Sequence, residues 1–190
     1  MPPRGRNSLI RAGWVLGKVQ DFALLQSFDC CDSDLNDFFR RDALPHKNQL
    51  LAEVYSLTDA SDNSCPPILV GLATFHNDAI KLSKDQKKGL LPPEKHYEFH
   101  PAVKIGRLGV AIPFQGNGIG THLLNMAKQF FLEDNRTGCR FITVDAYNKP
   151  RVLNFYQKND FQFLHEKDAN RRTRIMYFDL LRLSAIPALG

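Results

Sequence analysis

The sequence of 190 residues lacks any long hydrophobic run, because no apolar stretch approaches the ~18 residues needed to cross a bilayer. Its first residues also lack the apolar centre of a secretion signal. Internal repeats and low-complexity segments are missing as well. These absences favour a cytoplasmic protein, with residues 1–8 as a flexible tail and residues 9–190 as one domain large enough to bury a core.

Cysteine is scarce, and the four cysteines show no Cys-x-x-Cys spacing and no neighbouring pair of histidines. This pattern excludes the usual zinc modules and a disulfide framework. We therefore expect no bound metal and reduced, structural cysteines at Cys30, Cys31, Cys65 and Cys139.

Acidic residues are outnumbered, with 20 Asp and Glu against 25 Lys and Arg, a formal net charge of +5 and a pI near 9.1. A basic balance favours an anionic ligand or partner. Solvated loop faces and a nucleic-acid footprint both remain open as explanations. The basic residues gather in three groups: Arg4, Arg6 and Arg11; Lys81, Lys84, Lys87 and Lys88; Arg171, Arg172 and Arg174.

The most informative segment is an apolar run rich in β-branched residues over residues 103–112, which stops at Pro113. Glycines follow at alternate positions, Gly116, Gly118 and Gly120, and apolar residues then recur at helical spacing. This order predicts a strand, a glycine turn and a helix that begins near Ile119. Free N–H groups and the positive end of the helix dipole would face the turn, which is a place that binds phosphate.

Two common phosphate loops do not fit this segment. A Walker loop needs Gly-Lys-Ser/Thr, whereas Gly120 is followed by Thr121 and His122. In a dinucleotide-binding loop the third glycine would come one residue later. The segment Gln115-Gly-Asn-Gly-Ile-Gly120 does match Gln/Arg-x-x-Gly-x-Gly/Ala, and so resembles the pyrophosphate loop of the GNAT superfamily of acyl-CoA N-acyltransferases.

The next part of the chain extends the resemblance. Residues 140–146 predict a buried strand, Asn148-Lys-Pro150 a turn, and residues 152–158 a short helix. The run Asn154-Phe-Tyr-Gln-Lys-Asn-Asp-Phe161 is similar to the family's Phe-Tyr-x-x-x-Gly-Phe pattern. Because Asp160 stands at the glycine position, we expect Asn159 or Asp160 to adopt the left-handed conformation that ends this helix.

The resemblance implies an α/β (α+β) single-domain GNAT-like fold, whose central sheet is mixed, mostly antiparallel, with about six or seven strands and about four flanking helices. It implies acetyl-CoA as co-substrate and Tyr156 as general acid. From the sequence itself, Arg107 is a candidate to meet a substrate phosphate, with an ion pair or sheet-face packing as the alternative, and Asp145 is a substrate-side candidate that could instead orient a turn. No general base is evident on the central strand. The substrate amine could already be neutral because its pKa is low, or a water chain from Asp145, Glu98 or His100 could take its proton. The residues implied for cofactor binding are Leu108, Gly109, Val110, Gln115, Gly116, Asn117, Gly118, Ile119, Gly120, Thr121 and Asn148.

The N-terminal half resembles the bacterial GNAT branch that includes toxins of toxin–antitoxin pairs, through Phe28-Asp-Cys30, then Leu35-x-x-Phe38-Phe39, and Gly106-Arg-Leu-Gly-Val110. This implies acetylation of aminoacyl-tRNA, with tRNA, an antitoxin protein and a second copy of the chain as possible partners. A small-molecule or protein amine without toxin activity is the alternative acceptor. A catalytically weak CoA-binding regulatory module is the alternative class.

The remaining elements are predicted from local patterns. Residues 14–19 and 175–183 favour strands, and residues 51–58 and 68–76 favour a hairpin. Asp32 or Ser33 is expected to cap a helix that ends before Pro45. Residues 84–101 are expected to be mostly loop, because prolines break regular structure there.

Overall fold

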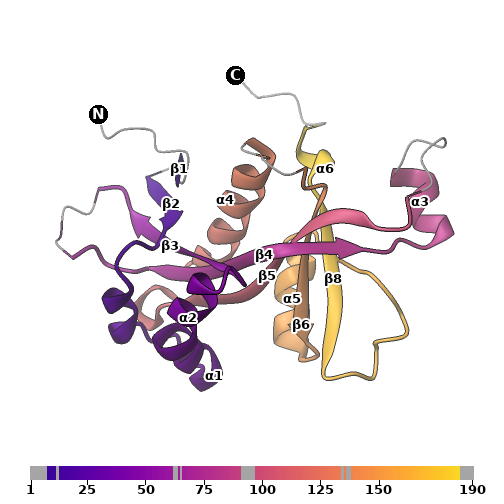
Figure 1. The fold of residues 1–190 in the computed structure, drawn as a ribbon. Helices are drawn as coiled ribbons and strands as arrows, with labels where there is room; N and C mark the ends of the chain where they lie inside the picture. Colours follow the sequence, from indigo (N-terminus) through magenta and orange to yellow (C-terminus); the bar gives the residue numbers. More distant parts are fainter. Residues whose placement is uncertain are drawn as a thin grey trace. The chain divides into compact units, whose positions relative to one another are not determined.

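The computed structural model describes residues 8–11, 13–61, 64, 66–90, 97–133, 135 and 138–184. The chain separates into two compact units, which share the long strands β4 (Gly71–Ile80) and β5 (His100–Val110). Unit 1 comprises Met1–His76 and Ile105–Asp134, and unit 2 comprises Asn77–Lys104 and Asn135–Gly190. Figure 1 shows β4 and β5 side by side.

Unit 1 contains strands in the order β1-β2-β3-β4-β5, and the pairs from β1 to β4 are antiparallel. Its further elements are β1 (Ser8–Arg11), β2 (Trp14–Lys18), η1 (Phe22–Ser27), α1 (Ser33–Asp37), η2 (Phe38–Asp42), α2 (Ala43–Asn48), β3 (Glu53–Asp59), η3 (Ile112–Phe114) and α4 (Ile119–Glu133).

The alternation of side chains along β3 places the helices of unit 1 on opposite faces of the sheet. Val54 packs with Phe38 and Phe39 from the α1–η2 segment. The next residue, Tyr55, stacks on Phe130 of α4, with ring centroids 5.3 Å apart. Unit 1 therefore has two apolar layers, one beneath the first helices and one beneath α4 (Figure 1).

Unit 2 continues the sheet in the order β4-β5-β6-β8-β7, and β8 pairs antiparallel with both of its neighbours. Its core contains Ile80, Phe141 and Tyr177. Its further elements are α3 (Lys84–Leu90), β6 (Phe141–Tyr147), α5 (Pro150–Lys158), β7 (Gln162–Phe163), β8 (Thr173–Asp179) and α6 (Leu181–Ser184).

The predicted fold class is confirmed, with local corrections. The sheet has eight strands, because β1 and the two-residue β7 add to those expected. The helix predicted to end before Pro45 continues through a π-helical turn to Asn48, since proline is tolerated in the first turn of α2. Part of the predicted loop over residues 84–101 is helix α3. The final strand ends at Asp179 and is followed by α6.

Two other predictions concern the chain ends and membranes. Residues 1–7 of the predicted tail lie outside the described residues, and Ser8 belongs to β1. Within the described residues, no helix combines the length and the apolar character needed to span a membrane.

Candidate active site

The glycine segment adopts the predicted strand–turn–helix geometry. Gly116 and Gly118 have positive φ values of +81° and +76°, and a Cβ added at either would meet nothing within 4 Å. The N–H of His122 donates to the Gly118 carbonyl at 3.0 Å. The N–H groups of Ile119, Gly120 and Thr121 precede that bond, so they have no partner within the helix. The turn thus presents helix N–H groups beside open space.

Gln115 anchors this turn through its side chain. Its Nε2 donates to the carbonyl oxygens of Cys30 and Val110, each at 2.9 Å. Both side-chain amide hydrogens are therefore used within the protein, and so is the backbone N–H of Gln115, which donates to the Ile112 carbonyl at 3.2 Å. We conclude that the glutamine of the motif fixes the loop after β5.

Gly109, one of the implied cofactor contacts, lies against the protein's own side chains. A Cβ at this position would lie 3.2 Å from Cys30 Sγ and 3.3 Å from Phe28 Cε1. These distances are tighter than ordinary van der Waals contact, so the absent side chain makes room for the protein's own residues. Leu108, Gly109 and Val110 remain predicted cofactor contacts through their backbone, as part of β5.

Arg107 lines a cavity of about 230 Å³ on the face of unit 1 covered by the first helices. Its guanidinium lies over the Phe38 ring, 4.7 Å from the centroid, and Nη1 donates to the Gly106 carbonyl at 2.9 Å. Its Nε is buried without a hydrogen-bond partner. A Cβ on Gly106 would approach Thr74 Oγ1 to 2.9 Å, so glycine is needed there to keep this wall intact. The cavity is lined by apolar residues (Phe38, Leu51 and Ala52) and by polar ones (His46, Thr74, His76 and Arg107).

Tyr156 is held on α5 in unit 2 with only 6% of its surface exposed. Its ring contacts Phe155 and Phe161, with centroids 5.1 and 5.4 Å away. Burial raises the pKa of the hydroxyl above its usual value of 10.0. The hydroxyl is therefore fully protonated at neutral pH, as a proton donor must be. Asp160 has a φ of +65°, which confirms the predicted left-handed turn after this helix.

Asp145 lies in an ion-pair network in unit 2. Its Oδ2 is 3.2 Å from Lys104 Nζ, which is also 3.5 Å from Asp78. Asp78 in turn accepts a hydrogen bond of 2.6 Å from Thr143 Oγ1. The structure thus pairs Asp145 with a lysine on the neighbouring strand.

The two other candidates for a proton relay differ in exposure. Glu98 is exposed, and its contact with Lys81 lowers the pKa of its carboxyl. His100 is buried, and burial is the main cause that lowers the pKa of its imidazole below 6.5, with further effects from Lys87 and Arg140. Its Nε2 has no hydrogen-bond partner. Both histidine and glutamate belong to unit 2, as Tyr156 does.

The chain was compared with protein families, and the match falls on the elements that carry the glycine turn and Tyr156. Residues 88–163 match the family model for the acetyltransferase (GNAT) domain. The GNAT acetyltransferase match is thus shown for residues 88–163. The match includes β5, α4, β6 and α5. It therefore covers both the glycine turn and Tyr156. The acetyltransferase class predicted from the sequence is confirmed.

Solved structures of other proteins resemble the chain over most of its length. A tyrosine-to-phenylalanine mutant of KacT has a TM-score of 0.72 and 20% identity, covering 90% of this chain and 98% of its own. AtaT complexed with acetyl-methionyl-tRNAfMet has a TM-score of 0.72 and 22% identity, covering 90% and 97%. AtaTR bound with AcCoA has a TM-score of 0.69 and 22% identity, covering 92% and 98%. At these identities the likeness shows the fold.

Asn148 makes contacts within the acetyltransferase domain that the sequence did not predict. Its Nδ2 donates to the carbonyl oxygens of Ala169 and Arg171, at 2.7 and 3.0 Å. Its backbone N–H donates to the Arg172 carbonyl at 2.9 Å. Asn148 therefore joins the loop after β6 to the loop before β8, and only its Oδ1 remains available as a ligand contact.

The predicted site residues divide between the two units. Arg107 and the glycine turn belong to unit 1, whereas Asp145, Asn148 and Tyr156 belong to unit 2. Sequence reasoning missed Phe38 and Thr74 as walls of the Arg107 cavity, because their elements lie far from Arg107 along the chain. Among the described residues, no group of three or more His, Cys, Asp or Glu is arranged to hold a metal.

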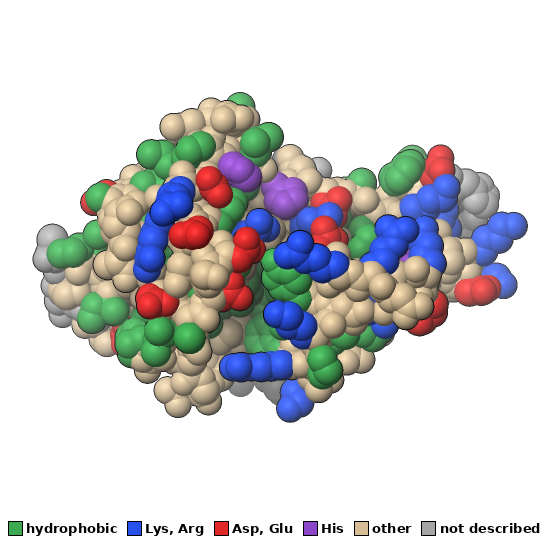
Figure 2. Space-filling view, turned by 90° about the horizontal axis from the view of Figure 1, so that it is seen from below, with side chains coloured by type: hydrophobic (Ala, Val, Ile, Leu, Met, Phe, Trp, Pro, Cys, Tyr) green, Lys and Arg blue, Asp and Glu red, His purple; other side chains and the backbone are tan. Residues whose placement is uncertain are grey.

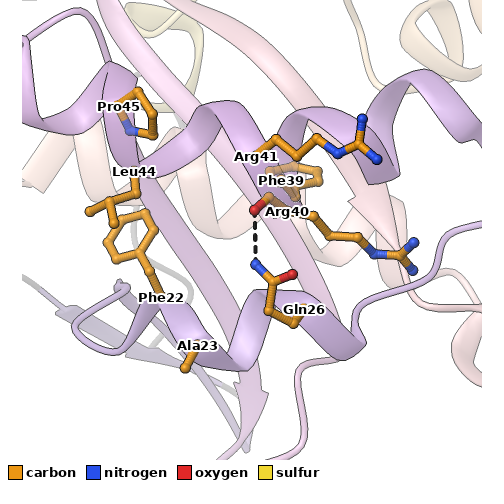
Figure 3. A pocket seen from close by; sticks show the side chains of 8 residues that line it. All are labelled: Phe22, Ala23, Gln26, Phe39, Arg40, Arg41, Leu44 and Pro45. Atoms are coloured by element: carbon orange, nitrogen blue, oxygen red, sulfur yellow. Dashed lines mark hydrogen bonds between the residues drawn. The ribbon is translucent and has the colours of Figure 1, made fainter.

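A second hollow, of about 430 Å³, lies between η1 and α2 in unit 1. Figure 3 shows Phe22, Leu44 and Pro45 at one end and the guanidinium groups of Arg40 and Arg41 pointing away from them. Gln26 Nε2 donates to the Arg40 carbonyl at 2.8 Å across this hollow. None of the predicted site residues lines it.

Proposed function

We propose that the protein is an acetyl-CoA-dependent N-acetyltransferase that acts on the α-amino group of aminoacyl-tRNA. The observation that carries the cofactor assignment is the open glycine turn at the N-terminus of α4, where backbone N–H groups face outward. Such a helix entrance binds a diphosphate without a lysine or arginine in the loop. The likeness to AtaT, solved with acetyl-methionyl-tRNAfMet, and to AtaTR, solved with AcCoA, supports this acceptor and this cofactor.

The cofactor would lie along two backbone segments of unit 1. The segment from Gln115 to Thr121 would hold the diphosphate through the N–H groups that follow Gln115, with Gly116, Asn117 and Gly118 leaving room for close approach. The backbone of residues 108–110 would receive the pantetheine arm. The Oδ1 of Asn148 is the one side-chain atom of that residue left for a cofactor contact.

The reaction transfers an acetyl group from sulfur to nitrogen. The substrate amine attacks the thioester carbonyl, so that a C–N bond forms and the C–S bond breaks. Tyr156 donates its hydroxyl proton to the departing sulfur, and the proton shed by the nitrogen restores the hydroxyl through solvent. The raised pKa makes the tyrosinate short-lived. An aminoacyl ester has an α-amine that titrates low, which accounts for a central strand without a glutamate base.

The acceptor side is assigned to the Arg107 cavity. Its apolar residues suit an amino-acid side chain, and the guanidinium of Arg107, which lines the cavity, suits a carbonyl or phosphate oxygen. Asp145 is the candidate for contact with the substrate amine, and its ion pair with Lys104 holds the carboxylate in place. The proposed function also implies a cytoplasmic location, because aminoacyl-tRNA is used there. It further implies an antitoxin protein as partner and a homodimer. AtaT bound to the C-terminus of the antitoxin AtaR supports the antitoxin partner.

The test is mass-spectrometric detection of products after incubation with acetyl-CoA and charged tRNA. We expect N-acetyl-aminoacyl-tRNA from the wild type, and turnover lowered by about ten- to a thousandfold in Tyr156→Phe, because the proton donor is lost. Acetyl-CoA affinity, measured by calorimetry, should change less than about twofold. Phe155→Leu, which alters the ring beside Tyr156, is the matched control for packing.

The outcomes separate the alternatives. Acetylation of a small amine or a protein in place of tRNA would overturn the acceptor assignment and keep the enzyme class. Acetyl-CoA binding without acetylation of any amine would favour a regulatory CoA-binding module. Unchanged turnover of Tyr156→Phe, under conditions where chemistry limits the rate, would remove Tyr156 from the mechanism.

A further inference from the structure

The two units of the chain differ in charge. Unit 2 contains 16 Lys and Arg and 9 Asp and Glu, a formal net charge of +7, whereas unit 1 contains 9 and 11, a net charge of −2. On the face shown in Figure 2, Lys and Arg side chains gather over unit 2, and Asp and Glu side chains are prominent over unit 1. The basic character of the protein is thus a property of unit 2.

Several cations of unit 2 are neutralised by acidic neighbours. Arg140 pairs with the buried Asp179 at 2.6 Å, and Arg174 pairs with the buried Asp168 at 3.1 Å. The other ion pairs described in this unit are Arg174 with Glu166, Lys81 with Glu98, Lys88 with Asp85, and Lys104 with Asp78 and Asp145. These residues support the fold, and they use most of the carboxylates in this unit.

Four exposed cations form a separate set on two adjoining loops. Lys149 and Arg151 flank Pro150 at the start of α5, and Arg171 and Arg172 precede β8. None of the four has an ion pair with an acidic residue among those that the structure describes. Together with Tyr147, we name these residues the basic cluster.

Two kinds of contact hold the basic cluster in place. The three hydrogen bonds of Asn148 to residues 169–172 join the two loops, next to the register pair Tyr147–Thr173 of β6 and β8. Lys149 Nζ and Arg172 Cζ lie 5.7 and 5.6 Å from the centroid of the Tyr147 ring. Stacking on an aromatic ring restrains long cationic side chains. The positive charges are therefore partly ordered before any ligand arrives.

We propose that the basic cluster binds the phosphate backbone of the RNA acceptor, an inference that rests on the proposed function. Cations interleaved with an aromatic ring are typical of nucleic-acid surfaces. Four charges on two loops exceed what a single phosphate group needs. Arg151 and Tyr156 lie five residues apart on α5, which is about 7.5 Å along its axis. RNA that is bound at the basic cluster would therefore lie close to the proton donor.

The experiment compares the double variant Arg171→Ala/Arg172→Ala with Arg41→Ala, an exposed arginine of unit 1. Binding of uncharged tRNA is measured by filter retention at several salt concentrations. We expect the double variant to lose about tenfold or more in affinity, and the slope of log affinity against log salt to fall by about one to two. Arg41→Ala should keep both values, and the KM for acetyl-CoA should be unchanged in both variants.

Each result has one reading. Unchanged tRNA affinity and salt slope in the double variant, with a wild-type thermal unfolding curve, would overturn the proposal. A raised KM for acetyl-CoA that disappears with acetyl-dephospho-CoA would also overturn it, because the cluster would then serve the cofactor. Loss of tRNA affinity in a protein whose wild type acetylates only another amine would support this surface while the proposed function fails.

Discussion

Two different physical means of anion binding are proposed for the two units. The glycine turn in unit 1 offers backbone N–H groups, and residues 108–127 contain no charged side chain. The basic cluster in unit 2 offers exposed Lys and Arg side chains in a unit of net charge +7. Backbone dipoles fix the position of one diphosphate, whereas exposed side-chain charges attract a long polyanion and are screened by salt. Net charge alone therefore does not reveal where the cofactor binds.

The largest effect is expected from Gly118→Val in unit 1. A branched side chain would occupy the open space that the diphosphate needs, and the φ of +76° costs any non-glycine residue about 1–2 kcal/mol. We expect the KM for acetyl-CoA to rise by about ten- to a hundredfold in steady-state assays.

Gly138→Val is a matched control for this variant. Gly138 has a φ of +74°, has nothing within 4 Å of an added Cβ, and belongs to unit 2. It should show the same loss of stability in urea unfolding without the change in KM. Equal KM values for the two variants would contradict the assignment of the diphosphate to the unit 1 turn.

Elements whose signals lie close together in the sequence could be predicted, whereas contacts between distant parts of the chain could not. The α4 turn was predictable because alternate glycines followed by apolar periodicity act locally. Helix α3 was missed although Ser83 and Gln86 form reciprocal cap hydrogen bonds of 2.8 and 3.2 Å, a local signal that could have been found. Gln86 Nε2 also donates to the carbonyl of Leu164, a contact across 78 residues that no local pattern reveals.

The site shows the same limit. Tyr156 and the glycine turn were predicted from motifs, whereas the wall of the Arg107 cavity depends on Phe38 and Thr74, which tertiary packing brings there. Gly109 is implied by the resemblance as a cofactor contact, and in the structure its missing Cβ makes room for Cys30. A motif identifies the residue type that a site needs, and packing decides which neighbour that residue serves.

An intermediate effect is expected from Arg107→Met, which removes the guanidinium that lines the cavity and keeps much of the side-chain volume over Phe38. We expect the KM for the acceptor to rise by about tenfold, the usual cost of a lost hydrogen bond to a charged donor, while the KM for acetyl-CoA stays within about twofold. Initial-rate kinetics with each substrate varied in turn measure both constants.

The control for this variant is Arg182→Met in unit 2, whose guanidinium lies 5.7 Å from the Phe178 ring centroid. It removes a second arginine that is stacked on phenylalanine and should leave both constants unchanged. An equal rise in both KM values for Arg107→Met would indicate a general loss of structure, and an unchanged acceptor KM would remove the cavity from the acceptor side.

The smallest effect concerns the pH dependence of unit 2 through His100, which is 4% exposed. Burial, then Lys87 and Arg140, lower the pKa of His100 in the folded protein below 6.5. The unfolded chain then binds a proton more readily, so the stabilising contribution is complete above pH 6.5 and is lost as the pH falls towards the folded pKa. His100→Gln removes this dependence. We measure the urea unfolding midpoints of both proteins from pH 5 to 8. The midpoint of the wild type minus that of the variant should be smaller at pH 5 than at pH 8. A constant difference across that range would mean that only packing against Phe141, and no titration, distinguishes the two proteins.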